Sequence, residues 1–428
     1  MRKSNLLGGA LLLAALFVNT SCKEIFGNMD LSGDTTVSSY VAINTASKTA
    51  APAEEFTLSI TKIGDGSVTW SSSDPAIAEV QGAGLSAKVI AKKSGNATIT
   101  ANVAAAGNYQ AGSAKCAVAV RVQTFDQFKA ELTAETTEAN VYVADAANIE
   151  FNENLDISGK KVAIIGNQSN PATIVVTKQF TIDDDFVMKN LKLDFSGSTS
   201  NFVKFKEEQT ETKKMEGVIF ENIEAVKLQK PLFYSNCKGF LMNNFSIINS
   251  VIELAAAQKI VDFSKGSSAY NINIDKSTLY SSATSYTQTY TSQGGEKLTD
   301  LDADGIQTFN ITNSTFYNLS KNVNFFSHRQ NSQKWLKFVV KNNIFVDCGK
   351  SKQVIQGLNG GGTSTNPTFD VDSNVFNYGG ADESATEVSP NSDQPNKNNI
   401  AAVITFKDAA KGDFTQSNVQ VGDPRWIK

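Results

Sequence analysis

The fold is decided by a repeated segment that first occurs as Phe186-Val187-Met188-Lys189-Asn190. Its first and third residues are apolar, its fourth is polar, and the residue three places beyond the fifth is apolar again. The pattern recurs without gaps in Val218-Ile219-Phe220-Glu221-Asn222, Phe240-Leu241-Met242-Asn243-Asn244, Ile272-Asn273-Ile274-Asp275-Lys276, Phe309-Asn310-Ile311-Thr312-Asn313, Phe338-Val339-Val340-Lys341-Asn342 and Phe369-Asp370-Val371-Asp372-Ser373. The fifth positions lie 22 to 37 residues apart, which is too short for separate domains. Alternating apolar residues at these intervals predict a parallel β-solenoid with coils about 4.8 Å apart.

The fifth position of the repeat is occupied by Asn in five of the seven segments. A carboxamide donates and accepts hydrogen bonds, so a column of Asn can bond along the solenoid axis and satisfy an inward-facing turn. Lys276 and Ser373 interrupt this column. We therefore interpret the Asn residues as scaffold rather than as a functional site.

A short amphipathic helix is predicted before the repeat. Thr124 is a good N-cap, and Phe125, Phe128 and Leu132 fall on one helical face. A helix at this position could cover the open first edge of the solenoid, which would otherwise invite pairing with other strands.

The first 22 residues have the features of a targeting signal. Arg2 and Lys3 precede an apolar run, residues 6–18, that is too short to span about 30 Å of hydrocarbon. The run leads to Cys22, and the whole resembles a bacterial lipoprotein signal in which Cys22 is the lipid acceptor, although Asn19 stands where that family prefers Leu or Val. An ordinary secretory signal is the alternative. Polar residues 23–35 are expected to form a tether.

Residues 36–122 contain several short strands with alternating apolar residues, separated by turn residues, which indicates a β-sandwich. The segments Val68-Thr69-Trp70-Ser71-Ser72-Ser73-Asp74 and Ser94-Gly95-Asn96-Ala97-Thr98-Ile99-Thr100-Ala101 resemble bacterial Ig-like domains of group 2. This resemblance implies a spacer that holds another module away from the membrane. Trp70 is expected in the core.

Residues 123–428 resemble right-handed parallel β-helix proteins of the pectate-lyase-like class, through the repeat, the preceding helix and Lys161-Val162-Ala163-Ile164-Ile165-Gly166-Asn167. With the terminal Gly422-Asp423-Pro424-Arg425-Trp426, the layout resembles Bacteroidota surface lipoproteins encoded with polysaccharide-utilisation machinery. The expected fold is therefore all-β: an Ig-like sandwich, a capping helix and a β-helix. The resemblance implies an outer-membrane location facing the cell exterior, with other glycan-uptake proteins as partners and the lipid as the only membrane contact. Trp426 is interpreted as part of a C-terminal latch.

Composition excludes several classes of function. The 39 Lys and Arg against 43 Asp and Glu give a net charge of -4, which argues against a nucleic-acid partner. A single His and four Cys leave little for His-centred catalysis or a zinc site. Cys116, Cys237 and Cys348 are interpreted as small buried residues, and a disulfide between two coils is the alternative.

Polysaccharide lysis is the enzymatic alternative, because the β-helix resemblance implies a Lys or Arg base and often a calcium ion. Arg329 or Lys334 would be the base. Asp300, Asp302 and Asp304 resemble the start of a calcium loop, but Ile311 stands where an EF-hand needs Glu, so a surface turn is the preferred interpretation and no cofactor is required.

Glycan binding is the preferred hypothesis. Sugars stack their C–H faces on aromatic rings and bond their hydroxyls to amides and charged groups. The longest interval of the repeat carries several Tyr, and the next interval carries a basic and aromatic run, so that the candidate carbohydrate-binding residues are Tyr286, Tyr290, His328, Arg329, Lys334 and Trp335. Core packing of the aromatic residues is an equal alternative. A structural or adhesive surface protein is the third class of function.

Overall fold

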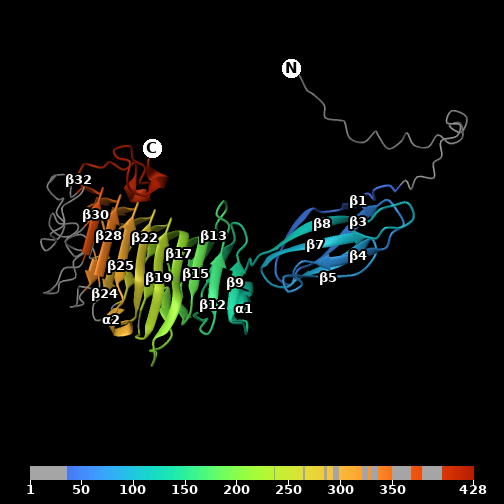
Figure 1. Ribbon diagram of the computed structural model, residues 1–428. Helices are drawn as coiled ribbons and strands as arrows, with labels where there is room; N and C mark the ends of the chain where they lie inside the picture. The colour runs from blue at the N-terminus through green and yellow to red at the C-terminus, as the bar shows by residue number, and fades with distance from the viewer. Residues whose placement is uncertain are drawn as a thin grey trace, which may run out of the picture.

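The computed structural model describes residues 36–428 except 236, 264–265, 284–286, 293–297, 321–325, 329–335, 349–367 and 378–397. Figure 1 shows two β-rich units in a row, with the shorter unit on the N-terminal side and the longer stack of strands after it. No helix within these residues is long and apolar enough to cross a membrane.

The N-terminal unit is a β-sandwich. Its strands are β1 (Val41–Ile43), β2 (Ser47–Ala50), β3 (Glu55–Lys62), β4 (Val68–Ser72), β5 (Ala78–Gln81), β6 (Ser86–Ala91), β7 (Gly95–Val103) and β8 (Gly112–Val120). They form two sheets, ordered β1-β3-β6-β5 and β2-β8-β7-β4. Alternate residues of β7 are buried, as expected for a strand with one face on a core. Trp70 packs on this core, and its Nε1 donates to the Gly84 carbonyl at 3.0 Å.

The C-terminal unit is a parallel β-solenoid of about seven turns. Its strands are β9 (Glu138–Tyr142), β10 (Asn148–Phe151), β11 (Leu155–Asp156), β12 (Lys161–Ile165), β13 (Ala172–Val176), β14 (Phe180–Ile182), β15 (Phe186–Asp194), β16 (Val203–Phe205), β17 (Lys213–Leu228), β18 (Phe233–Tyr234), β19 (Phe240–Ile248), β20 (Val251–Leu254), β21 (Lys259–Asp262), β22 (Ser268–Asp275), β23 (Thr278–Ser281), β24 (Gln288–Ser292), β25 (Gln307–Thr312), β26 (Thr315–Tyr317), β27 (Phe326–His328), β28 (Leu336–Lys341), β29 (Ile344–Val346), β30 (Thr368–Asp372), β31 (Val375–Asn377) and β32 (Ile400–Ala401). Helix α1 (Phe125–Thr133) precedes them, α2 (Leu298–Leu301) follows β24, and the 3-10 turns η2 (Ala409–Lys411) and η3 (Pro424–Trp426) lie near the end. Every pairing between solenoid strands is parallel.

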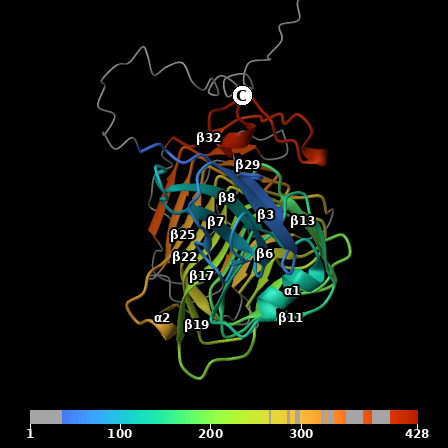
Figure 2. The same cartoon turned by 90° about the vertical axis from the view of Figure 1, so that its right-hand side faces the viewer.

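The coils have three faces, and Figure 2 shows the solenoid from the end that carries α1. Face A contains β9, β12, the first halves of β15 and β17, and then β19, β22, β25, β28 and β30. Face B contains β10, β13, the second halves of β15 and β17, and then β20, β23, β26, β29, β31 and β32. Face C contains β11, β14, β16, β18, β21, β24 and β27.

From β15 onward, a left-handed residue bends the coils from face A to face B. These bend residues, with φ between 48° and 59°, are Asn190, Asn222, Asn249, Lys276, Asn313, Asn342, Ser373 and Asn398. Asn tolerates positive φ better than most side chains, which explains its frequency there. The amides also bond between coils: Asn222 Nδ2 donates to Asn190 Oδ1 at 2.8 Å, and Asn249 Nδ2 donates to Asn222 Oδ1 at 3.2 Å.

One predicted repeat was placed in the wrong register. Phe245, not Phe240, pairs with Val218, so Asn249 rather than Asn244 continues the column of bend residues. The segments beginning at Phe240 and Phe245 both place apolar residues at the first and third positions and Asn at the fifth. At the fourth position the first segment has the polar Asn243 and the second the apolar Ile248, so the repeat pattern favours the wrong register. Pairing with β17, whose 16 residues extend beyond the coil, selects Phe245 instead. The other six segments pair as the repeat predicts.

The inward-facing polar column lies one residue beyond the predicted one. The bend residues Asn190 and Asn222 are half-buried, whereas the residues after the later bends are buried. This buried column comprises Ser250, Ser277, Ser314, Asn343 and Asn374. Each side chain accepts a hydrogen bond from a backbone N–H of the preceding coil, at 2.9 to 3.1 Å. The column thereby satisfies backbone donors that the bend removes from the strand pairing.

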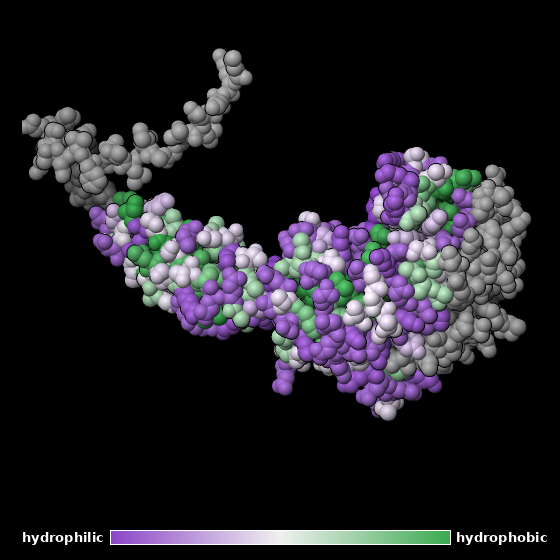
Figure 3. Space-filling view, turned by 180° about the vertical axis from the view of Figure 1, so that it is seen from behind, coloured by the Kyte–Doolittle hydropathy of each residue, from purple (hydrophilic) through white to green (hydrophobic). Residues whose placement is uncertain are grey.

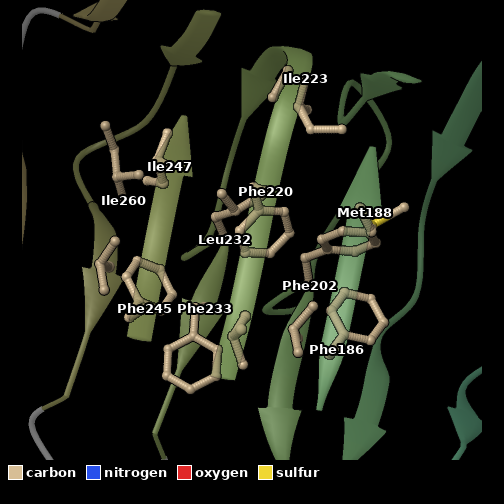
Figure 4. Packing of buried hydrophobic residues seen from close by; sticks show 14 of the residues in the cluster. Phe186, Met188, Phe202, Phe220, Ile223, Leu232, Phe233, Phe245, Ile247 and Ile260 are labelled. Atoms are coloured by element: carbon tan, nitrogen blue, oxygen red, sulfur yellow. The ribbon is translucent and has the colours of Figure 1, made fainter. Parts of the chain in front are cut away.

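The solenoid interior is filled by columns of aliphatic and aromatic side chains, some of which Figure 4 shows pointing inward from neighbouring strands. Phe316 and Phe345 stack at 5.0 Å between ring centroids, and Phe345 and Phe376 stack at 5.3 Å. These distances follow the spacing of neighbouring strands, so identical residues in successive coils pack face to face. Cys116, Cys237 and Cys348 are buried, as the sequence predicts.

Helix α1 lies at the first edge of the solenoid. Thr124 caps it by accepting a hydrogen bond from Gln127 N at 3.3 Å, and Phe128 and Leu132 are buried in the solenoid core. The predicted capping helix is therefore confirmed.

Face B is covered over its later coils by the C-terminal segment, residues 402–428. Ile344, Val346 and Val375 on the outer side of this face pack against Ile404. Figures 1 and 3 show this segment projecting from one side of the solenoid. An outward apolar patch of the sheet is thus buried within the same chain.

Candidate functional site

Two of the six sequence-predicted binding residues, Tyr290 and His328, lie in described strands, and both strands belong to face C. Tyr290 lies in β24 and His328 in β27, and the register pairs Tyr290 with Phe326 and Ser292 with His328. The structure therefore brings these two backbone segments side by side. Tyr286, Arg329, Lys334 and Trp335 lie outside the described residues, as does Cys22, so the predicted site stays a prediction.

The acidic candidates for calcium lie at α2 and the turn after it. Asp302 accepts hydrogen bonds from the Tyr270 hydroxyl and, at 3.3 Å, from Asp304 N. The Tyr270 hydrogen bond lowers the pKa of the Asp302 carboxyl. Asp300 lies within α2, and Asp304 is exposed. In the part of the chain that the structure describes, no three His, Cys, Asp or Glu are grouped closely enough to hold a metal ion.

A groove of about 350 Å³ lies on face B where the C-terminal segment ends. Its floor is formed by the outer side of β15, β17, β20 and β23, which contribute Lys192, Glu224, Val251 and Tyr280. Gln168 and Pro171 stand at one side, and Lys411, Gly412, Arg425 and Trp426 at the other. We call this feature the face B groove.

The wall of the groove is built on a buried carboxylate. Asp423 is 1% exposed and accepts hydrogen bonds from Thr278 Oγ1 at 2.8 Å and from Arg425 Nε at 3.0 Å. Burial raises the pKa of the Asp423 carboxyl, while Arg425 and Thr278 oppose the rise. Trp426 Nε1 donates to Thr278 Oγ1 at 2.7 Å, so the indole is fixed against β23.

Arg425 connects this wall to the column of bend residues. Its Nη2 donates to Asn249 Oδ1 at 3.0 Å and to the Lys276 carbonyl at 3.1 Å. Lys276 has no amide group to donate to Asn249, so Arg425 supplies a donor where the column changes residue type. These contacts agree with the interpretation of the terminal residues as a latch, and they also make the latch one wall of a groove.

The floor carries an exposed ion pair between Lys192 Nζ and Glu224 Oε2, 3.4 Å apart. A similar pair, Lys189 and Glu221, joins the same two strands at 2.6 Å on face A and does not line the groove. Tyr280 is buried beneath the latch, and burial together with the charges of Glu253 and Glu224 raises its pKa to about 12. The Tyr280 hydroxyl therefore stays protonated at neutral pH and can act as a hydrogen-bond donor.

Sequence reasoning missed this groove. Its residues range from Gln168 to Trp426 and belong to five different coils and the chain terminus. The one signal was the terminal Gly422-Asp423-Pro424-Arg425-Trp426, which the sequence indicated only as a latch.

Comparison with known families finds two matches. Residues 42–114 match the bacterial Ig-like domain (group 2), and residues 147–282 match a domain of unknown function (DUF4957). Searches of curated proteins and of solved structures each found no match. The floor of the face B groove falls within the second region. The chain therefore combines a group 2 bacterial Ig-like domain with a DUF4957 region that forms part of a β-solenoid.

Proposed function

We propose that this chain is a non-catalytic, surface-anchored lipoprotein that binds a polysaccharide in the face B groove. One observation carries the proposal: Trp426 is fixed at the edge of a solvent-open groove whose floor carries the exposed Lys192–Glu224 pair. An aromatic ring next to donors and acceptors suits a sugar, which has apolar C–H faces and many hydroxyls.

The length of the groove favours a polymer over a single sugar. Its floor spans β15, β17, β20 and β23, which are consecutive strands of face B. At one strand spacing per step, the three steps across this floor extend over roughly 14 Å, which is longer than one sugar ring. The strands are held by paired backbone groups on both sides, so the floor is formed before a ligand arrives.

The location is proposed from the sequence. A lipid on Cys22, residues 23–35 as tether and the Ig-like domain as spacer would hold the groove away from an outer membrane, facing the exterior. The solenoid supports the resemblance to the pectate-lyase-like class, and other glycan-uptake proteins are the proposed partners. Mass spectrometry of the mature protein tests the anchor, because acylation adds lipid mass to Cys22.

The binding proposal is tested by retention of the full chain in gels that contain pectic or hemicellulosic polymers. The double variant Lys192→Ala, Glu224→Ala is expected to lose retention by at least about tenfold, the equivalent of about 1.4 kcal/mol. The matched control Lys189→Ala, Glu221→Ala removes the similar pair on face A and should retain wild-type binding.

Three outcomes would contradict the proposal. Equal loss in both double variants would show that the groove has no special role, and no retention of the wild type on any polymer would favour an adhesive or structural protein. Ultraviolet absorbance from unsaturated products would instead select the lyase hypothesis.

A further inference from the structure

We propose that the junction between the Ig-like domain and the solenoid is a second, independent binding site, for one or two units of a neutral saccharide. The junction contains a cavity of about 440 Å³, which is larger than the face B groove. Residues of both domains line it, among them Ile77 and Asn96 from the sandwich and Glu131, Asn140 and Tyr142 from the start of the solenoid. Cavities at domain interfaces are common ligand sites.

The two domains are held together around this cavity by a buried serine. Ser94 is 3% exposed; its N and Oγ donate to the two carboxylate oxygens of Glu131, each at 2.6 Å. Ser94 Oγ also accepts a hydrogen bond from Tyr142 N at 2.8 Å. One side chain of the Ig-like domain is therefore bonded to both α1 and β9.

The connection between the domains is itself paired with the solenoid. Val122 N donates to the Tyr142 carbonyl, and Ala144 N donates to the Val122 carbonyl, both at 2.9 Å. A paired connection fixes the distance and angle between the domains, so the cavity keeps its shape without a ligand. Such preorganisation lowers the entropic cost of binding.

The lining supplies the groups that a sugar needs. The Arg121 guanidinium lies 5.3 Å from the centre of the Tyr142 ring, which holds the ring in place beside the cavity. Asn140 is exposed on β9 at the same cavity. Each oxygen of Glu131 accepts one hydrogen bond from Ser94, and a carboxylate has about four acceptor positions, so Glu131 can also accept from ligand hydroxyls.

The charges of the lining favour a neutral ligand over an acidic one. Glu131 and Glu138 contribute two carboxylates, against one ammonium group from Lys93. An anionic sugar would therefore be repelled, while hydroxyl donors would be attracted. This preference does not depend on the face B groove.

The test is saturation-transfer NMR titration of the full chain with D-glucose, D-galactose, D-xylose and D-glucuronate as probes. At least one neutral probe should bind saturably, and D-glucuronate should bind more weakly than D-glucose. Tyr142→Ala and Asn140→Ala should each weaken binding of that neutral probe by at least about tenfold. The matched control Asn148→Ala removes an exposed amide from β10, outside the cavity, and should bind like the wild type.

The proposal is overturned if no neutral probe binds saturably, if D-glucuronate binds more tightly than D-glucose, or if Asn140→Ala and Asn148→Ala behave alike. Circular dichroism checks that each variant is folded. If Tyr142→Ala unfolds, Asn140→Ala alone tests the site, because it leaves the Ser94–Glu131 contacts in place. The groove variant Lys192→Ala, Glu224→Ala should keep junction binding, so failure at one site is distinguishable from failure at the other.

Discussion

The buried polar column makes a sharp prediction at two adjacent residues. Asn343 is fully buried; its Oδ1 accepts from Ser314 N at 2.9 Å, and its Nδ2 donates to the Ile311 carbonyl at 2.8 Å. Asn342 is exposed, and its Nδ2 donates only a 3.3 Å hydrogen bond to Asn313 Oδ1. The two side chains are identical, so their different surroundings alone should decide the cost of removing each one.

Asn343→Ala should lower the free energy of unfolding by about 2–4 kcal/mol. The substitution leaves the Ser314 N–H buried without its acceptor, at a cost of about 1–3 kcal/mol, and removes a carbonyl hydrogen bond worth about 1 kcal/mol. The control is Asn342→Gly, since Gly adopts the observed φ of 57° without strain. This control should cost less than about 1 kcal/mol.

The measurement is guanidinium unfolding of the full chain, followed by circular dichroism. Asn343→Ser supplies a rescue, because Ser314 Oγ already accepts Ser277 N at 3.1 Å in the neighbouring coil. A Ser at position 343 should therefore recover about 1 kcal/mol or more of the loss. The reasoning is refuted if Asn342→Gly costs as much as Asn343→Ala, or if Ser recovers nothing.

Three further predictions follow from burial and close packing. Burial raises the pKa of the Glu131 carboxyl above its ordinary value of 4.5, so the folded state binds more protons than the unfolded state above that pH. The free energy of unfolding of the wild type, relative to that of Glu131→Gln, should therefore rise as the pH falls from 7 to 5, by at most about 1.4 kcal/mol per pH unit. Guanidinium midpoints at both pH values measure this, and a change of the opposite sign would contradict it. Burial raises the pKa of the Cys348 thiol to about 12, so iodoacetamide at pH 8 should alkylate this thiol only after the protein unfolds. Mass spectrometry measures the alkylation, and rapid alkylation of the native protein would refute the burial of Cys348. Gly217→Ala should lower the free energy of unfolding by more than about 3 kcal/mol, because the added Cβ would lie 1.8 Å from the Asn244 carbonyl oxygen. Gly84→Ala should lower it by only about 1 kcal/mol, because that Cβ would meet open space and only the φ of 76° is unfavourable. Equal thermal shifts in these two variants would argue against the β17–β19 register.

The candidate sites show where sequence reasoning ends. The Tyr and basic residues near 286–335 stand out by composition, and their chemistry suggests sugar binding. The face B groove and the junction cavity are made instead of residues that look ordinary in sequence, such as Lys192, Glu224 and Asn140. No local pattern marks them, because their grouping depends on which coils and which domains meet.

The sequence by itself determined the solenoid and the sandwich. Alternation places every second side chain of a strand on one face, so apolar residues at fixed offsets predict the inward columns without any knowledge of pairing. Helix α1 was equally local, because its cap and its apolar stripe lie within nine residues of each other.

Only the tertiary structure decided the register of β19, the position of the buried polar column and the second role of the terminal latch. The segment starting at Phe240 fits the repeat better than the segment starting at Phe245, whose fourth residue is the apolar Ile248, and pairing with β17 nevertheless selects Phe245. Likewise, Trp426 meets Thr278 across 148 residues of sequence. Contacts of this kind depend on how many residues each coil contains, and neither hydrophobic period nor turn propensity encodes that number.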